Sequence, residues 1–484
     1  MRSIPNKSNR DNSHFDSLNH DASQTSWVRQ EFAGADLGDE RLNQRLSALA
    51  EDFSAQPEAS IPKATGSWGQ ACAAYRFFDN GKVTMDNILA SHRQSTLERA
   101  QEQAIVLAVQ DSSSLSFTTH PQTKGLGPIR NKADSSRGVW LHTTMALSVE
   151  GVSLGIVDAQ SWARNPEELG KSRDRHRKPI EEKESYKWLK SFEATERASQ
   201  QTPQSQWVSI GDRESDLYEL FSLASKSDHR CALLVRANHN RQVEHDPKDL
   251  WNFLQNQPLA GTLVVKVPRQ KGRPARSATW SIRFGQVSLK PPCDKEATGG
   301  LTLWGILAQE TQPPQGVEPI QWRLLTTLAV QTLQEAIEKI RWYTIRWQIE
   351  VFHKILKSGC RAEDRQLETA ERLKRVLALD MIVAWRILFL TKLGRETPSG
   401  SVATILAEHE WKALYCFVHK TTQLPDQPPS PQEAMRMIGR LGGFLGRKGD
   451  GFPGSICLWR GLHRLNDIAA TWLLFNSTKD VRNA

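Results

Sequence analysis

The sequence predicts an α/β protein in which a β-rich central region lies between helical regions at the two ends of the chain. Between residues 104 and 237, short apolar runs of strand type alternate with amphipathic helical patterns in the order β-β-β-α-β-α-β. The next stretch, from about residue 238 to 330, has strand and loop patterns only. Helical periodicity dominates before residue 84 and after residue 395. These three observations predict a sheet-based core with helical domains on both sides.

The N-terminal region divides into a polar tail and a small helical domain. Residues 1–26 contain no apolar run of the kind found in signal peptides, so we expect a disordered polar tail. Two segments have helical spacing, LGDERLNQRLSALAEDFSA and SWGQACAAYRFFDN. We therefore expect a helical domain over 27–84, in which Arg41 and Arg45 are available to contact phosphates. An ordinary role as surface arginines is an equally good interpretation.

The central region begins with three strand patterns, AIVLAVQD, VWLHTTMALSVEG and VSLGIVDAQSW, the last two joined at the hairpin signal Glu150-Gly151. Helix and strand patterns then alternate in IEEKESYKWLKSFEATERA, QWVSIGD, RESDLYELFSLAS and CALLVRA. After the β-only stretch, helical patterns return at residues 343–357 and in VLALDMIVAWRILFLTKL. This last run contains Asp380 and Arg386, which predicts a buried core helix rather than a membrane span.

The composition favours a large cytoplasmic protein with a polyanionic partner. The chain has 484 residues, enough for about two to four domains. Lys and Arg number 63 against 54 Asp and Glu, so the net charge is +9, a modest excess that suggests nucleic acid. The six cysteines show no CxxC spacing. This argues against a zinc ribbon or a disulfide framework, and for a reducing cytoplasm.

Two of the apolar strand patterns end in an acidic residue, LAVQD at Asp111 and VSIGD at Asp212. Sites in α/β domains lie at the carboxyl ends of strands, so neighbouring strands would present both acids to one crevice. Glu350, on a helix packed against that sheet, would be the third carboxylate. Three oxygen ligands without His or Cys suit Mg²⁺ or Mn²⁺, and a pair of such ions promotes phosphodiester cleavage. The alternative for each Asp is a helix N-cap, and it is strongest for Asp212.

The segment YTIRWQIEVFHKILK combines one carboxylate with several cations. On a continuous helix, one narrow stripe holds Tyr343, Arg346, Glu350, Lys354 and Lys357, whereas apolar residues recur on another face. The stripe alone is typical of a solvated helix face with Arg/Glu and Glu/Lys pairs. Together with the two acids, it predicts a row that binds phosphates beside a metal site, with the tyrosine packed on a sugar or base.

The same segment resembles the Y-x2-R-x3-E-x6-K signature of bacterial cut-and-paste DDE transposases of the IS-four group. The resemblance covers nearly the whole chain after the tail, in blocks that follow the order of the family. They include LGDERLNQRL, AAYRFF, QDSSSLSF, DSSRGVWLHT, GDRESDLYELF, LLVRANH, IQWRLLTT and GRLGGFLGRKGDGFPGSICLW.

The resemblance implies a role for each candidate residue. Asp111, Asp212 and Glu350 match the catalytic, metal-binding triad. The DNA-contacting residues matched are Tyr343, Arg346, Lys354, Lys357, the backbone-contacting Arg236, and Trp322, which would receive a flipped base. For Trp322, the alternative is a tryptophan of the strand core. Two departures from the family pattern affect DNA contacts: Arg41 is followed by Leu42 where the family has tandem arginines, and Asn238 stands where it has Lys.

The family fold implied by the resemblance is an RNase H-like catalytic core over 85–394, with an inserted β-sheet subdomain at about 238–330. A helical DNA-end-binding domain precedes it and a helical dimerisation domain follows at 395–484. The implied partners are transposon-end DNA, target DNA and a second copy of the chain, and the implied location is the bacterial cytoplasm, at the nucleoid.

The implied activity is cleavage of element ends with two Mg²⁺ ions per site, with Mn²⁺ as an accepted substitute. It would proceed through a free 3′-OH and a DNA hairpin to joining with target DNA. Three alternatives remain at this point: an RNase H-like endonuclease that never joins strands, an inactive transposon-derived DNA-binding or inhibitory protein, and, remotely, a glycosidase.

Overall fold

The computed structural model describes residues 27–130, 136–168, 178–226, 228–268, 274–292, 300–396 and 400–480. The polar tail expected at 1–26 lies outside the described residues. The chain divides into two compact units. One comprises Met1–Ser91, Ile355–Arg365 and Arg375–Ala484, and the other comprises His92–Lys354 and Gln366–Lys374.

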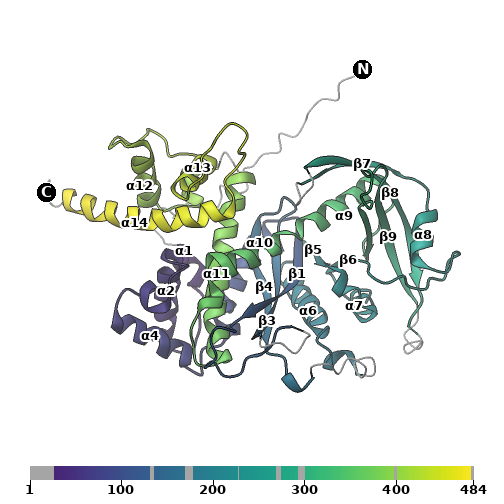
Figure 1. Cartoon of the computed structure of the whole chain (residues 1–484), viewed down its shortest axis with the longest axis horizontal. Helices are drawn as coiled ribbons and strands as arrows, with labels where there is room; N and C mark the ends of the chain where they lie inside the picture. Colours follow the sequence, from purple (N-terminus) through teal and green to yellow (C-terminus); the bar gives the residue numbers. More distant parts are fainter. Residues whose placement is uncertain are drawn as a thin grey trace. The chain divides into compact units, whose positions relative to one another are not determined.

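The second unit is built on one mixed sheet of ten strands (Figure 1). The strands are β1 (Ile105–Ser116), β2 (Gly127–Pro128), β3 (Arg137–Leu147), β4 (Ser153–Trp162), β5 (Gln206–Gly211), β6 (Ala232–Arg236), β7 (Gly261–Val267), β8 (Arg276–Leu289), β9 (Leu301–Glu310) and β10 (Gln321–Thr326). Their order is β2-β3-β1-β5-β6-β10-β9-β8-β7, with β4 paired to β3. The pairs β1/β5 and β5/β6 are parallel, and the other strand pairs are antiparallel. A mixed α/β core is therefore confirmed.

The expected hairpin joins β3 to β4. Its turn is closed by a hydrogen bond from the Ser148 N–H to the Val152 carbonyl, 2.9 Å long. Gly151 has a φ of 88°, in the left-handed region that glycine adopts most readily. The order β-β-β-α-β-α-β is confirmed, apart from the additional short strand β2.

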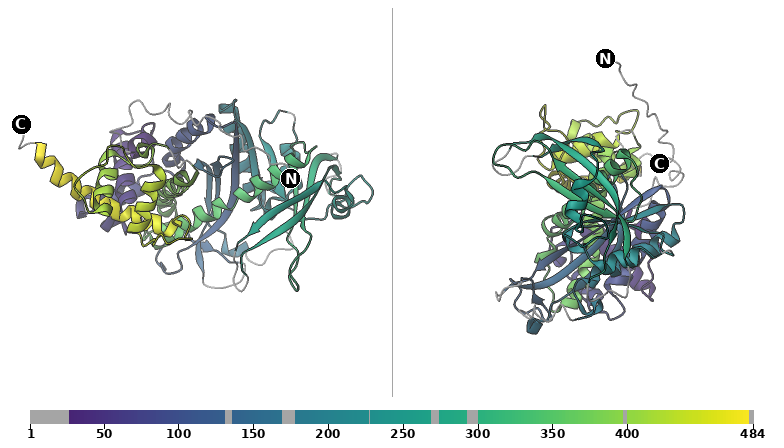
Figure 2. Two further views of the ribbon diagram at one scale, coloured as in Figure 1. Left: turned by 90° about the horizontal axis from the view of Figure 1, so that it is seen from above. Right: turned by 90° about the vertical axis from the view of Figure 1, so that its right-hand side faces the viewer.

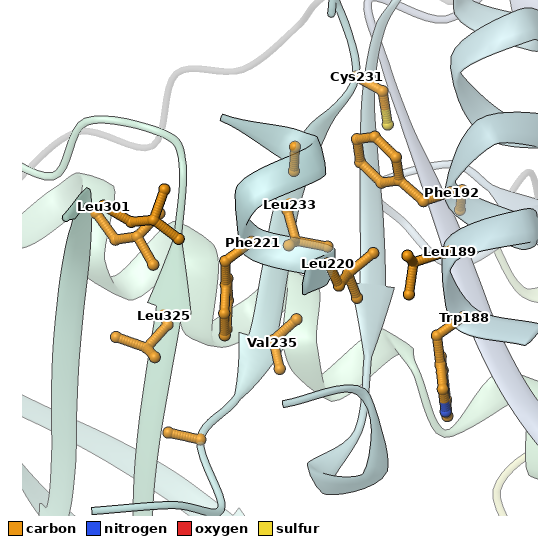
Figure 3. Packing of buried hydrophobic residues seen from close by; sticks show 14 of the residues in the cluster. Trp188, Leu189, Phe192, Leu220, Phe221, Cys231, Leu233, Val235, Leu301 and Leu325 are labelled. Carbon is orange, nitrogen blue, oxygen red and sulfur yellow. The ribbon is translucent and has the colours of Figure 1, made fainter. Parts of the chain in front are cut away.

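Helices α6 (Tyr186–Gln201) and α7 (Tyr218–Ala224) bury one apolar face against the parallel part of the sheet (Figure 3). Their contributions to this core are Trp188, Leu189, Phe192, Leu220 and Phe221, which lie beside Leu233 and Val235 of β6. Burying each large apolar side chain stabilises the folded state by about 1.5–3 kcal/mol. The core thereby fixes the carboxyl ends of β1 and β5, where the candidate acids lie.

The expected β insertion is present, but it is not composed of strands and loops alone. Leu250–Asn256 forms a helix, α8, because Asp249 caps it by accepting from the Asn252 N–H and its apolar residues recur at helical spacing. The strands of this region also do not form a separate sheet. β10 pairs with β6, so β7–β10 continue the same sheet.

The first unit is helical, and both ends of the chain contribute to it. Its helices are α1 (Trp27–Phe32), α2 (Glu40–Ala55), α3 (Ile61–Ala64), α4 (Trp68–Asp79), α12 (Glu408–His419), α13 (Pro431–Leu441) and α14 (Ser455–Asp480); α5 (Met85–Gln101) and α11 (Ala370–Glu396) each begin in one unit and end in the other. The Asn466 side chain of α14 donates to the carbonyl oxygens of Ser54 and Ala55, which links the two chain ends. The last turns of α14 project beyond α12 and α13 (Figure 2).

The apolar run at residues 376–393 is a buried core helix, as predicted. It forms most of α11, and both Asp380 and most of its apolar side chains are buried. No helix within the described ranges is long and apolar enough to cross a membrane.

The prediction of one continuous helix over 343–357 is wrong. α9 (Leu333–Ile345) ends at Ile345 with Arg346 as its C-cap, α10 covers Gln348–Lys354, and a π-helical turn, Ile355–Gly359, follows. The Thr344 hydroxyl donates to the carbonyl of Arg341 at 2.6 Å, a bond that competes with helical pairing and bends helices. The stripe is thus divided among three elements.

Candidate active site

The register of the sheet brings Asp111 and Asp212 side by side. The parallel strands β1 and β5 are paired as far as Val109 and Ile210. Extending this register by two residues sets Asp111 opposite Asp212, and residues opposite each other direct their side chains to the same face of a sheet. The sequence predicts that the strand ends at Asp111, and the structure contradicts this prediction. β1 continues to Ser116 because its second half pairs with β3.

Asp111 is largely buried, with 21% of its side chain exposed. Its Oδ1 accepts a hydrogen bond of 2.8 Å from the Ser112 N–H. Burial raises the pKa of Asp111 to about 6, the charge of Arg346 opposes this rise, and the charges of Asp212 and Glu350 add to it. Asp212 and Glu350 are therefore close enough to Asp111 to repel it electrostatically.

Asp212 follows β5 directly and caps the 3₁₀ turn Arg213–Ser215. Its Oδ1 accepts from the Glu214 N–H at 2.8 Å, while the Ser215 hydroxyl donates to its carbonyl at 2.6 Å. The capping role considered for this residue is therefore present. It engages Oδ1 and is compatible with a second role for a carboxylate that has two oxygens.

Glu350 lies in the first turn of α10, which packs against β1. Arg346, at the break between α9 and α10, connects it to Asp111. The Arg346 Nη2 donates to Glu350 Oε1 at 2.8 Å, and its Nη1 lies 3.6 Å from Asp111 Oδ2. The tertiary structure thus gathers two acids of the predicted triad around one guanidinium.

Three arginines lie close together beside the acids. Arg213 and Arg346 both lower the pKa of Arg236 through like-charge repulsion, in addition to the larger effect of its burial. Such an arrangement of guanidinium groups favours an anion. Arg213 was not recognised in the sequence. Its position next to Asp212, in DRESD, was the available signal.

Tyr343 and Trp322 form an aromatic group next to these arginines. Their rings are 5.1 Å apart and nearly perpendicular, and Trp322 meets Trp280 in the same way at 5.0 Å. The Arg236 guanidinium lies 5.7 Å from the Trp322 ring. Tyr343 is buried, which raises the pKa of its hydroxyl, whereas Trp322 is half-buried. Trp322 is the ring of this pair that retains exposed surface.

The remaining predicted DNA-contacting residues belong to other elements. Lys354, at the end of α10, is exposed. Lys357 is half-buried in the π-helical turn, which belongs to the first unit. In that unit Arg41 is 89% exposed and pairs with Asp39 at 3.0 Å, and Arg45 donates to the Gln70 side chain.

A buried polar network beside Asp111 escaped the sequence prediction. The Ser112 hydroxyl lies 2.8 Å from His142 Nδ1, and the Gln110 side chain donates to the Ser209 hydroxyl at 2.7 Å. Burial lowers the pKa of His142 well below its usual value, so the ring is neutral, and the direction of its hydrogen bond with the Ser112 hydroxyl depends on the tautomer. The polar run QDSSS within an otherwise apolar strand was the available signal.

The donors at this site fit a hard divalent cation in their chemistry. Asp111, Asp212 and Glu350 supply carboxylate oxygens only, and their mutual repulsion would be relieved by a cation. Within the described part of the chain, no three His, Cys, Asp or Glu side chains converge closely enough to hold a metal ion. In this arrangement the Arg346 guanidinium supplies the positive charge between Asp111 and Glu350.

Three family models match the chain in succession. The model described as Transposase DNA-binding matches residues 24–83, Transposase DDE domain matches 159–385, and Transposase Tn5 dimerisation domain matches 382–472. The DDE model includes Asp212 and Glu350 and begins after Asp111. The order of the models agrees with the helical N-terminal region, the mixed sheet and the helical C-terminal region of the structure.

Among solved structures, one match is a cryo-EM structure of the piggyBac transposase synaptic complex with hairpin DNA. The match covers 81% of this chain and 73% of the piggyBac chain, at 10% sequence identity and a TM-score of 0.35. A similarity at this score carries no argument about the present chain. The three family models, by contrast, match in the order of one known architecture. The chain belongs to the Tn5-like DDE transposases.

Proposed function

We propose that this transposase binds the ends of its element, cleaves them in a metal-dependent reaction and joins them to target DNA, with Asp111, Asp212 and Glu350 as its catalytic acids. The observation that supports the assignment is that Arg346 bridges Asp111 and Glu350, while Asp212 follows β5, the parallel neighbour of the strand that carries Asp111. Carboxylate oxygens are the ligands that hard divalent cations prefer, and ends of parallel strands are common places for such sites.

Asp111, Asp212 and Glu350 would hold Mg²⁺, two ions per site, with Mn²⁺ as a substitute. Bound there, the ions would supply the positive charge that activates water or a 3′-OH and stabilises the leaving oxygen. The protein contributes the positions of the carboxylates. Ser112 orients Asp111 through its N–H, and Ser215 holds the backbone of Asp212.

The cations and aromatic rings around the acids would position DNA. Arg236 and Arg346 would contact phosphates, with Lys354 and Lys357 further along the strand. Trp322 would stack on a flipped base at a hairpin end, beside Tyr343. Arg41 and Arg45 would contact the element end from the domain that we place at residues 27–84.

We propose that cleavage proceeds through a 3′-OH and a hairpin and takes place in a dimer that pairs two ends. The family match to a dimerisation domain at 382–472 supports the dimer. We place the catalytic domain at residues 85–394 and the dimerisation domain at residues 395–484. Acting on its element, the protein would work in the bacterial cytoplasm, bound at the nucleoid.

The test uses the DNA that flanks the gene, because matched inverted repeats there would be the substrate. Labelled duplexes from both flanks are incubated with the full chain and Mg²⁺, and nicks, hairpins and joined products are separated on denaturing gels. Asp111→Asn, Asp212→Asn and Glu350→Gln should each abolish cleavage and retain end binding. Glu214→Gln, an exposed acid two residues from Asp212, serves as the matched control and should cleave normally.

Each other outcome identifies an alternative. Cleavage without joined products would favour an endonuclease that does not transfer strands. End binding without any cleavage by the wild-type chain would favour an inactive, DNA-binding descendant. Near-normal nicking by one of the three acid variants would remove that residue from the site.

A further inference from the structure

Arg346 occupies the centre of the acidic cluster rather than its edge. Its side chain is only 14% exposed, and its two terminal nitrogens face Glu350 at 2.8 Å and Asp111 at 3.6 Å. Nη1 is buried and has no hydrogen-bond partner among the described residues, although it faces a carboxylate. Arg346 is thus attached firmly to Glu350 and only loosely to Asp111.

The guanidinium and a divalent cation would compete for the same carboxylates. A positive charge a few ångströms from a carboxylate strongly disfavours a second cation there, because the interaction in a partly buried site is much less screened than in water. The oxygens of Glu350 and Asp111 that face Arg346 are those a metal ion would use. Metal binding therefore requires Arg346 to move or to share its charge.

The surroundings of Arg346 offer it another partner. Arg236 lies close enough to repel it electrostatically, and Tyr343 interacts with both arginines, with its ring 5.9 Å from the Arg346 guanidinium. A phosphate placed at these two arginines would relieve the repulsion and accept paired hydrogen bonds from a guanidinium. The residue also lies at the break between two helices, where the side chain starts from a helix terminus rather than from a continuous helix.

We propose that Arg346 is an exchangeable counter-cation: it neutralises Asp111 and Glu350 in the DNA-free protein, moves to a DNA phosphate when DNA binds, and so couples metal binding to DNA binding. The inference rests on the proposed function, since it takes these acids as the metal ligands. Coupling of this kind is reciprocal, so metal must tighten DNA binding by the same factor by which DNA tightens metal binding. The consequence is that the acids accept metal mainly when a DNA strand is in place.

The experiment measures Mn²⁺ binding to the full-length protein by the EPR signal of free Mn²⁺, with and without the flanking duplex described above. Without DNA, Arg346→Gln should bind Mn²⁺ about tenfold more tightly than wild type, since a competing charge is removed. Arg341→Gln, which removes an exposed arginine of α9, is the charge-matched control and should bind as wild type does. With DNA, wild-type Mn²⁺ affinity should rise about tenfold, and that of Arg346→Gln should stay constant.

Equal or weaker Mn²⁺ binding by DNA-free Arg346→Gln would overturn the proposal, as would a wild-type affinity that DNA leaves unchanged. Asp111→Asn and Glu350→Gln separate this failure from failure of the proposed function. If these variants bind Mn²⁺ as wild type does, the acids are not the metal site at all. If Arg346→Gln does not fold, Arg346→Met, which keeps the apolar stem and removes the charge, is measured in the same way, and equal or weaker DNA-free Mn²⁺ binding by it would overturn the proposal.

Discussion

Arg365 and Asp380 form a buried ion pair with two hydrogen bonds. Nε donates to Oδ2 at 3.0 Å and Nη2 to Oδ1 at 2.6 Å, and the side chains are 3% and 1% exposed. The same guanidinium donates to the carbonyl oxygens of Pro57 and Ala59, so it ties the segment after α2 to α11 within the first unit. The predicted core helix thus carries a charge that another part of the chain neutralises.

Asp380→Ala should lower the free energy of unfolding by about 3–5 kcal/mol, because it leaves the Arg365 guanidinium buried without its counter-charge. The double variant Arg365→Met/Asp380→Leu should lose less, since neither charge remains. Urea unfolding followed by circular dichroism measures both. Asp364→Ala is the control, since it breaks an exposed pair with Arg361 and should cost below about 1 kcal/mol. Additive losses in the double variant would contradict the prediction.

The Asp111 carboxyl should destabilise the folded protein at pH values above the pKa that it has in the unfolded state. Burial raises the pKa of this carboxyl from 3.8 to about 6, so between these values the folded state retains a proton that the unfolded state releases. Stability then falls as pH rises through this window. Without metal, Asp111→Asn should stabilise the protein by about 2–3 kcal/mol near pH 7.5 and by almost nothing near pH 3, below the unfolded-state pKa. Urea midpoints in EDTA at both pH values test this, and a pH-independent difference would contradict it.

Lys354→Ala should weaken DNA binding and reduce its salt dependence. Removing one phosphate contact lowers the slope of log K against log salt by about 0.9. Arg346→Ala should lower it by a similar amount in the presence of Mg²⁺. Fluorescence anisotropy at several salt concentrations measures the slopes, with Lys412→Ala of α12 as the control. If Lys354→Ala retains the wild-type slope, this part of the stripe is a solvated helix face.

Trp322→Ala should slow hairpin formation more than first-strand nicking, because only the hairpin step needs a stacking surface for an unpaired base. Trp322→Phe should retain part of the rate. The ring also packs edge-to-face on Trp280 and Tyr343, so thermal unfolding must be measured in parallel. Trp280→Ala, which removes a buried neighbour, serves as the packing control. Equal losses in both steps with reduced thermal stability would show that Trp322 is only a core residue.

The apolar residues of the C-terminal block GRLGGFLGRKGDGFPGSICLW are only partly available for an interface. Leu441, Leu458 and Trp459 are buried within their own chain. Exposed apolar surface remains at Leu445 and, on α14, at Leu474 and Phe475, which are 72% and 70% exposed.

Leu474→Asp/Phe475→Asp should therefore leave single-end binding intact and abolish paired-end complexes and double-strand cuts. A gel-shift with end fragments of two lengths, scored for mixed complexes, makes the measurement. Thr471→Asp, an exposed polar position on the same helix, is the control. Mixed complexes formed by the double variant at wild-type levels would place dimerisation elsewhere.

The local sequence determined the fold class, most secondary elements and the three candidate acids. Strand type followed from apolar runs such as AIVLAVQD, and the hairpin from Glu150-Gly151, because turn chemistry and side-chain periodicity depend on neighbouring residues only. The core helix containing Asp380 was identified for the same reason. The three acids could be proposed because each lies in a recognisable local pattern.

Tertiary contacts decided which side chains lie next to those acids. The pairing of β6 with β10 joined the expected insertion to the main sheet, and a strand partner more than eighty residues away cannot be read from a local pattern. The helix break at Arg346 moved that side chain from a stripe on one helix into the space between Asp111 and Glu350. Helical periodicity assumes a continuous backbone, and the backbone between α9 and α10 is not continuous helix. Sequence determined which charges are present, and long-range packing determined which of them lie together.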